Sequence, residues 1–299
     1  FTTEAARHPD QAWFPTERTP EELSTVTADN RMVCEPYTKL LNSILTVDMA
    51  AAFVIMAAEV AQDLQIPRDR WVFSWASATC NDVYFPVQRP DLSRSAGIRA
   101  AGSRVLAAAG IGLDDVSWFD LYSCFPAAVE AAVDALGLEA TDPRGFTVTG
   151  GLPYHGGPGN NYVSHSIVEM ARRCRADPKG VGMVSGLGWY ITKHSVGLWS
   201  ATPPPKGWQA PDMSSVQASI DSTALHVVET SAAVGTARID GYTVVHDRDT
   251  GPASVPVFAS TLDGHRVVAR SDDPDVAAAF LFGLFVAHEI DLKPAHDHA

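Results

Sequence analysis

Apolar stretches typical of strands alternate with helical patterns over the first two thirds of the chain. Residues 49–56 form a continuous run of alanine, β-branched and other apolar residues, which is typical of a buried strand. Residues 57–64 continue as a short helix that ends before Pro67, and residues 71–78 predict a second strand. Residues 1–30 are polar and lack a clear period, so we expect a loop there.

The same alternation continues to residue 200. The predicted elements are, in order, a helix over 94–109, a strand over 118–122, a helix over 126–136, a glycine-rich turn at 150–159, a helix over 161–173 and a hairpin of two strands, 181–190 and 194–200. Strands that alternate with helices and finish in a hairpin indicate a layered α/β/α domain with a mixed sheet. At the start of the last strand, His194 is expected to be a surface turn residue.

The composition changes after this domain. Residues 201–211 contain four prolines, which is typical of a stiff linker. Short β-rich segments follow, separated by the turns Asp240-Gly241 and Asp263-Gly264, and then a helix over 275–284 and a last strand over 286–292. This pattern predicts a small OB-like β-barrel domain over residues 212–299.

Charge and composition limit the classes of partner. The net charge of −13 opposes binding to nucleic acid, and residues 212–293 carry 12 acidic against 5 basic residues. The longest apolar runs are far shorter than the roughly 20 residues that span a bilayer, so we expect no membrane span. Four cysteines at irregular spacing form neither a disulfide framework nor a zinc pattern. We therefore expect a cytoplasmic protein without a metal site.

Three motifs occur in a fixed order in the α/β part. Residues 114–125 contain an acidic start, an apolar strand and then Tyr122-Ser123-Cys124-Phe125; Gly150-Gly151 precedes Gly156-Gly157-Pro158; and residues 183–188 form a glycine-containing strand. In this order they resemble the motifs in the C-terminal half of thiolases, especially of the sterol-carrier-protein type. The resemblance implies a thiolase-like fold over residues 67–200. It also makes residues 1–66 a loop region and the end of the N-terminal thiolase half, most of which the chain lacks.

The resemblance implies chemistry on acyl-CoA thioesters, with coenzyme A as part of the substrate. In thiolases a cysteine of the N-terminal half takes the acyl group, a Gly-His-Pro histidine activates it, and a last cysteine acts as acid and base. Here the histidine position falls on Gly157 and the oxyanion-motif residue on Tyr122, with Ser123 beside it. Because no cysteine follows Cys174, standard thiolysis by these residues is disfavoured.

Substitute candidates remain for the catalytic and substrate-binding positions. The catalytic candidates are His155, Tyr122 and Ser123, and the substrate-binding candidates are Gly156, Gly157, Gly159, Asn160, Gly186 and Gly188. His155 lies two residues before the vacated position, either as a displaced base or as a turn residue bonded to backbone. The alternative role of Asn160 and Asn161 is to cap the following helix. The glycines either admit an acyl or pantetheine group or only allow positive φ.

Three functional hypotheses follow. The first is an acyl-CoA-binding acyltransferase of lipid, fatty-acid or sterol metabolism that uses His155 and Tyr122. The second is an aldolase-type lyase on a β-hydroxyacyl-CoA, since tyrosine-dependent thiolase-like aldolases work with an OB-fold partner. The third is a non-catalytic acyl-CoA-binding scaffold. The expected partners are the acyl-CoA, the missing N-terminal half and a homo- or hetero-oligomer.

Overall fold

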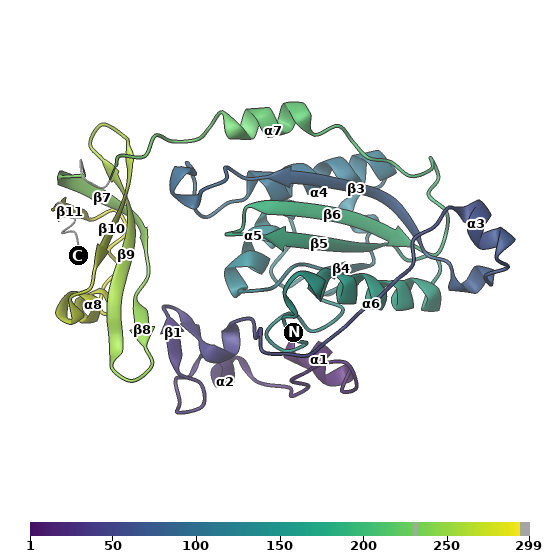
Figure 1. Ribbon diagram of the computed structural model, residues 1–299, viewed down its shortest axis with the longest axis horizontal. Coiled ribbons are helices and arrows are strands. Elements are labelled where there is room, and N and C mark those ends of the chain that lie inside the picture. Colours follow the sequence, from purple (N-terminus) through teal and green to yellow (C-terminus); the bar gives the residue numbers. More distant parts are fainter. Residues whose placement is uncertain (230–232, 294–299) are drawn as a thin grey trace. The chain divides into compact units, whose positions relative to one another are not determined.

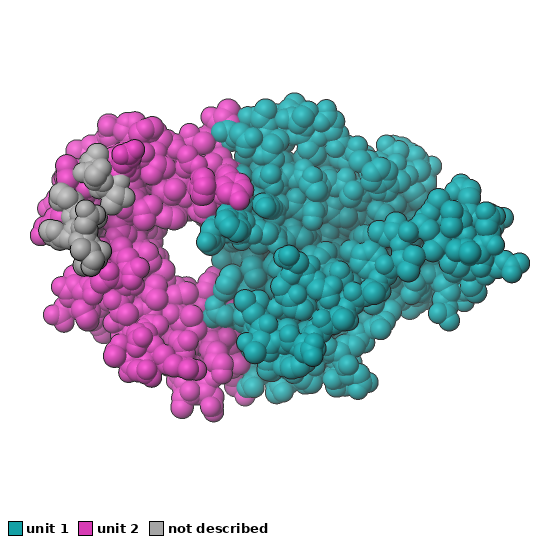
Figure 2. Space-filling view, viewed as in Figure 1, with its two compact units in different colours: residues 1–19, 42–82, 93–221 teal, residues 20–41, 83–92, 222–299 magenta. Residues whose placement is uncertain are grey.

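The computed structural model describes residues 1–229 and 233–293, which fall into two units (Figure 2). Unit 1 comprises Phe1–Thr19, Asn42–Asp82 and Ser93–Asp221. Unit 2 comprises Pro20–Leu41, Val83–Leu92 and the described residues from Ser222 onward. Each unit therefore combines segments that lie far apart in the sequence.

A four-stranded mixed sheet lies at the centre of unit 1 (Figure 1). Its strands are β3 (Phe73–Asn81), β4 (Trp118–Asp120), β5 (Gly182–Gly188) and β6 (Lys193–Ser200), in the order β3-β6-β5-β4. Strand β4 runs parallel to β5, whereas β6 is antiparallel to both β5 and β3. The mixed sheet confirms the α/β fold expected from the alternating pattern.

Helices cover both faces of this sheet. Helix α4 (Ala96–Ala109) packs on one face, where a side chain at Gly97 would meet the ring of His194, and α5 (Pro126–Leu136) packs on α4. Helix α6 (Tyr162–Ala176) packs on the other face, where Met170 and Cys174 form a buried cluster with Trp199 partly buried beside them. His194 and Trp199 of β6 lie on opposite faces of the sheet, because successive side chains of a strand alternate between the faces and these two are an odd number of residues apart.

Two sequence predictions for the first 60 residues are wrong. Helices α1 (Thr2–Arg7) of unit 1 and α2 (Pro20–Ser24) of unit 2 form where a loop was expected. The strand predicted over residues 49–56 has no regular structure, and Val54 and Ile55 are 80% and 78% exposed. A strand needs a neighbour for its backbone groups, and no described residue pairs with this segment. The other elements of unit 1 are α3 (Ala58–Asp63), η2 (Arg68–Arg70), η4 (Leu113–Asp115), η5 (Gly159–Asn161) and α7 (Ser214–Asp221).

Unit 2 is built on an antiparallel sheet with the order β11-β7-β9-β8-β1-β2, in which β10 also pairs with β9. The strands are β1 (Met32–Cys34), β2 (Tyr37–Thr38), β7 (Gly235–Tyr242), β8 (Val245–Asp247), β9 (Gly251–Thr261), β10 (Arg266–Ser271) and β11 (Glu289–Leu292), accompanied by η1 (Lys39–Leu41), η3 (Pro86–Gln88) and α8 (Pro274–Phe280). Helix α8 packs on β9 around the buried Ala277, Ile239 and Val257. In the described residues the sheet path is open, so the predicted OB-like barrel is not shown.

Candidate functional site

A buried carboxylate joins three parts of unit 1 beside the glycine-rich turn. Asp120 ends β4, is fully buried, and accepts hydrogen bonds from the segment before the turn and from α6. Its donors are Thr147 Oγ1 at 3.0 Å, the Val148 N–H at 2.9 Å, the Thr149 N–H at 3.3 Å and Oγ1 at 3.2 Å, the Tyr162 hydroxyl at 3.3 Å and Ser166 Oγ at 2.6 Å. Burial raises the pKa of Asp120, and these hydrogen bonds, Ser166 first, oppose the shift. The network therefore fixes the turn and the start of α6 relative to β4.

The N-terminal residues of the chain cover the glycine-rich turn. Gly150 and Gly151 have φ values of 108° and 82°, a left-handed region that favours glycine. A side chain at Gly150 would collide with Ala5 of α1, and one at Gly151 would collide with the Phe1 ring. These two glycines are therefore required for the chain to pack closely on itself.

Residues 43–49, the covering segment, lie over the second half of the turn. The Ser43 N–H donates to the Cys124 carbonyl at 3.0 Å, and the Gly157 N–H donates to the Ile44 carbonyl at 2.9 Å. A Cβ at Gly157 would collide with Ser43 Oγ, and one at Gly156 would collide with the Met49 sulfur. The covering segment thus leaves no room for a side chain at the position that resembles the thiolase histidine.

Ser43 is a polar residue of this region that the sequence did not indicate. Its Oγ is buried and has no hydrogen-bond partner among the described residues. Buried hydroxyls without a partner are uncommon, because leaving one unpaired costs about 1–3 kcal/mol. Ser43 lies in a segment without helix or strand periodicity, so no local signal pointed to it.

His155 lies in the turn and is buried, at 3% exposure. The backbone N–H of His155 donates to the Gly151 carbonyl at 2.7 Å, and its backbone carbonyl accepts from the Trp13 N–H at 2.9 Å. Neither ring nitrogen has a hydrogen-bond partner in the part of the chain that the structure describes. Burial, and then the neighbouring His165, lower the pKa of His155 to about 4. The imidazole is therefore neutral at physiological pH and lacks a carboxylate to orient it.

Aromatic rings connect His155 to the other predicted site residue. The His155 ring lies 6.2 Å from the ring of Tyr162, and the Tyr162 ring lies 5.5 Å from that of Tyr122. On the other side, the His155 ring lies 5.1 Å from that of His165 in α6. Tyr122 and His155 are thus brought to the same region, with the buried Tyr162 between them.

Tyr122 and Ser123 differ in their surroundings. Tyr122 is half-buried, burial raises the pKa of its phenol, and its N–H donates to Ser185 Oγ at 2.9 Å. Ser123 is buried, and its Oγ accepts the Leu152 N–H at 3.3 Å, which ties the motif to the glycine turn. Of these two candidates, Tyr122 is the one that reaches the surface.

The remaining predicted residues lie around the start of α6 and in β5. Gly159 and Asn160 are exposed in η5. The expected helix cap is absent, because Asn161 has helical backbone angles and its side chain makes no capping hydrogen bond. Its amide instead lies 3.4 Å from His165 Nε2. In β5, a side chain at Gly186 would collide with Ser195 Oγ, whereas Gly188 has more space.

The prediction that His194 is a surface residue is wrong. His194 is 4% exposed, and its Nε2 lies 2.8 Å from Asp82 Oδ2. Ser95 Oγ donates to the same carboxylate oxygen at 2.5 Å and caps α4 by accepting the Ile98 N–H. Because β6 pairs with β3 here, the strand carries His194 inward under α4. The cluster fixes the start of α4 and lies apart from the glycine turn in sequence.

Other candidate chemistry near the site is limited. Burial raises the pKa of the Cys124 thiol to about 11, so the thiol stays protonated at neutral pH. Within the described residues, no group of three histidine, cysteine or acidic side chains is placed to hold a metal ion. No helix among them is long and apolar enough to cross a bilayer.

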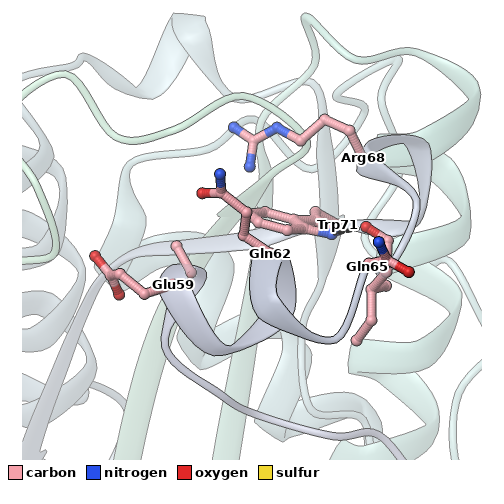
Figure 3. A pocket seen from close by; sticks show the side chains of 7 residues that line it. Glu59, Gln62, Gln65, Arg68 and Trp71 are labelled. Atoms are coloured by element: carbon pink, nitrogen blue, oxygen red, sulfur yellow. Dashed lines mark hydrogen bonds between the residues drawn. The ribbon is translucent and has the colours of Figure 1, made fainter.

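A separate cavity of about 520 Å³ lies beside α3 and contains none of the predicted residues. Arg68 lies over Trp71 (Figure 3). Its guanidinium carbon is 4.3 Å from the centre of the Trp71 ring. The other lining residues are Ala58, Glu59, Gln62, Gln65 and Ile66. The wall that they form has no buried polar group without a partner among the described residues.

The comparisons with known proteins agree with this geometry. A mixed sheet between helices, with a glycine-rich turn before α6, is the arrangement expected from the resemblance to a thiolase-like domain. The "Thiolase-like protein type 1 additional C-terminal domain" family matches residues 215–284. A solved structure of a monomeric SCP2-thiolase-like protein type 1 from Mycobacterium smegmatis is similar with a TM-score of 0.87 and 35% identity. The match covers 98% of this chain and 63% of that protein.

The chain belongs to the thiolase-like superfamily. It spans 63% of the length of the solved relative, so that protein has a portion without a counterpart here. No protein with a curated description matches the chain.

Proposed function

We propose that the chain forms the acyl-CoA-binding part of a thiolase-like protein of the acyltransferase class. The observation that carries the proposal is the grouping of Tyr122 and His155 around the ring of Tyr162, beside the glycine turn. In a thiolase-like fold this region corresponds to the acyl-CoA site implied by the sequence motifs. The nucleophile belongs, in this proposal, to the portion of the protein that the chain does not span.

The state of the polar groups favours binding and polarisation of a thioester over base catalysis. With a pKa of about 4, the neutral imidazole of His155 is a weak base at pH 7. The Tyr122 phenol is protonated, because burial raises its pKa. Neutral N–H and O–H donors suit a thioester carbonyl, whose oxygen gains negative charge during acyl transfer. Acyl transfer therefore depends on a base from elsewhere in the assembled protein.

Calorimetric titration with acetyl-CoA tests the proposal, with thiolysis of acetoacetyl-CoA measured in parallel. We expect acetyl-CoA to bind, and Tyr122→Phe to weaken binding by about fivefold to tenfold, the effect of one lost hydrogen bond. Tyr84→Phe, at an exposed tyrosine of unit 2, is the control. Absence of acetyl-CoA binding to the unsubstituted chain overturns the proposal.

A lyase on a β-hydroxyacyl-CoA is the second candidate. Its support is the Tyr122 hydroxyl, which has no hydrogen-bond partner among the described residues and lies at a motif position. A tyrosine in this state can donate to the β-oxygen of such a substrate. Release of an aldehyde or ketone that Tyr122→Phe abolishes would favour this activity over acyl transfer.

A further inference from the structure

His165 is a second imidazole of the ring group that the sequence did not indicate. It lies in the first turn of α6, and its ring is 5.1 Å from that of His155, with 70° between the ring planes. The two rings differ in access, because His165 is half-buried and His155 is 3% exposed. A ligand at the surface therefore meets His165 before it meets His155.

The hydrogen bonding of His165 leaves one ring nitrogen available. Its Nε2 lies 3.4 Å from the Asn161 amide nitrogen, so Nε2 accepts and Nδ1 carries the proton. The Nδ1–H has no partner among the described residues. Burial lowers the pKa of His165, which keeps the imidazole neutral and its Nδ1–H a donor.

Other titratable groups face the same pair of rings. His165 and, more weakly, His8 lower the pKa of His155. The Nε2 atom of His8 lies 3.4 Å from Oε1 of Glu4. At this distance the protonation of one imidazole disfavours the protonation of the other, because the two positive charges repel. His155 is therefore a neutral ring that packs behind the neutral ring of His165.

We infer that His165 is the imidazole of this site that contacts the thioester, through an Nδ1–H hydrogen bond to the carbonyl oxygen. His155 is the positioning residue behind it. This inference rests on the proposed acyl-CoA function and names the residue that meets the substrate. The histidine that contacts the substrate then lies in the first turn of α6. It does not lie in the glycine turn, which the covering segment and α1 cover.

Binding of acetyl-CoA and of free CoA to the full chain tests the inference. Free CoA lacks the thioester carbonyl, so His165→Gln should weaken acetyl-CoA binding about fivefold to tenfold and leave CoA binding unchanged. His226→Gln is the matched control, because His226 forms a similar edge-on pair with His265, 4.7 Å apart, in unit 2. Circular dichroism confirms that each variant folds.

An NMR titration of the imidazoles gives a readout that does not depend on a ligand. His165→Gln removes a group that lowers the pKa of His155, so this pKa should rise above about 4. Unchanged acetyl-CoA affinity in His165→Gln, or an equal loss for CoA, overturns the inference while the proposed function stands. If acetyl-CoA does not bind to the unsubstituted chain, both fail.

Discussion

At the scale of single residues, His155 makes the stability of unit 1 depend on pH. Its pKa is about 4 in the folded chain against 6.5 for an ordinary histidine, so the unfolded chain binds more protons between these values. The contribution is complete above pH 6.5 and is lost as the pH falls toward 4. We expect the free energy of unfolding to fall by about 3 kcal/mol across this window through His155.

Urea unfolding between pH 4 and pH 7 measures this effect. His155→Gln should flatten the pH dependence over the same window, because glutamine does not titrate. His226→Gln, at an exposed histidine, should leave it unchanged. If the free energy of unfolding of His155→Gln depended on pH as steeply as that of the unsubstituted chain, His155 would not be the source of the pH dependence.

Asp120 is the residue on which the turn depends most. Asp120→Asn replaces an acceptor of six hydrogen bonds with a group that accepts fewer and adds two donors. Only one oxygen remains in the amide, so the donors to the other one, either those at Oδ1 such as Ser166 Oγ or those at Oδ2 such as the Thr149 N–H, face an N–H group in a buried site. We expect a loss of about 3–5 kcal/mol in the free energy of unfolding, measured by chemical denaturation. Asp114→Asn, at an exposed position of η4, should change it by less than about 0.5 kcal/mol.

Part of the site was predictable from single residues, and part was not. Tyr122 and His155 come from recognised motifs, and the structure brings both to Tyr162. His165 lies on a helix whose period gave no reason to separate it from other polar positions. Ser43 is in a segment without a period, and its importance depends on Gly157, more than 100 residues away. Contacts of this range are not encoded in local patterns.

At the scale of elements, the covering segment explains why Gly157 replaces a larger residue. A Cβ at Gly157 collides with Ser43 Oγ, while its backbone angle is one that alanine accepts. Gly157→Ala should therefore destabilise the chain by about 1–3 kcal/mol through overpacking. In the double variant Ser43→Ala/Gly157→Ala, which removes the colliding oxygen, we expect roughly half of the loss to return.

The measurement is a double-mutant cycle by urea denaturation. Gly112→Ala is the control, because a Cβ there has open space apart from a contact at 3.7 Å with Asp115. If the two substitutions at Ser43 and Gly157 act additively, the covering segment does not press on the turn. If the double variant loses less stability than the sum of the losses of the two single variants, the contact between Ser43 and residue 157 is confirmed.

Helices and paired strands followed their sequence patterns closely. Helix α5 has the predicted bounds of 126–136, because a proline starts it and Gly137 ends it in a left-handed conformation. The run at 49–56 has an equally strong strand pattern but no strand beside it among the described residues. A strand forms only beside another strand, so the sequence pattern shows that a segment can form a strand but not that it does.

At the scale of the whole molecule, the two units are not consecutive in the sequence. Residues 20–41 supply β1 and β2 to the sheet of unit 2, where Cys34 of β1 pairs with Val245 of β8. A two- or three-residue strand carries too weak a local pattern to reveal such a pairing. The division of the chain therefore depends on long-range contacts.

The exposed run at 49–56 should make the chain associate with itself. Phe53, Val54 and Ile55 are 41%, 80% and 78% exposed in a segment with unpaired backbone groups. Contiguous exposed apolar residues of this kind promote association. We expect the double variant Val54→Asp/Ile55→Asp to remain a single species at concentrations where the unsubstituted chain forms larger ones in light scattering.

The same variant separates a surface segment from a core segment. Because both side chains are largely exposed, the substitutions should change the free energy of unfolding by less than about 0.5 kcal/mol. Val196→Asp, at a position that is 2% exposed in β6, should in contrast unfold unit 1, because it places a charge in the core. A large loss of stability in Val54→Asp/Ile55→Asp would mean that residues 49–56 are packed in solution. Because no described residue pairs with this segment, such packing would come from outside the part of the chain that the structure describes.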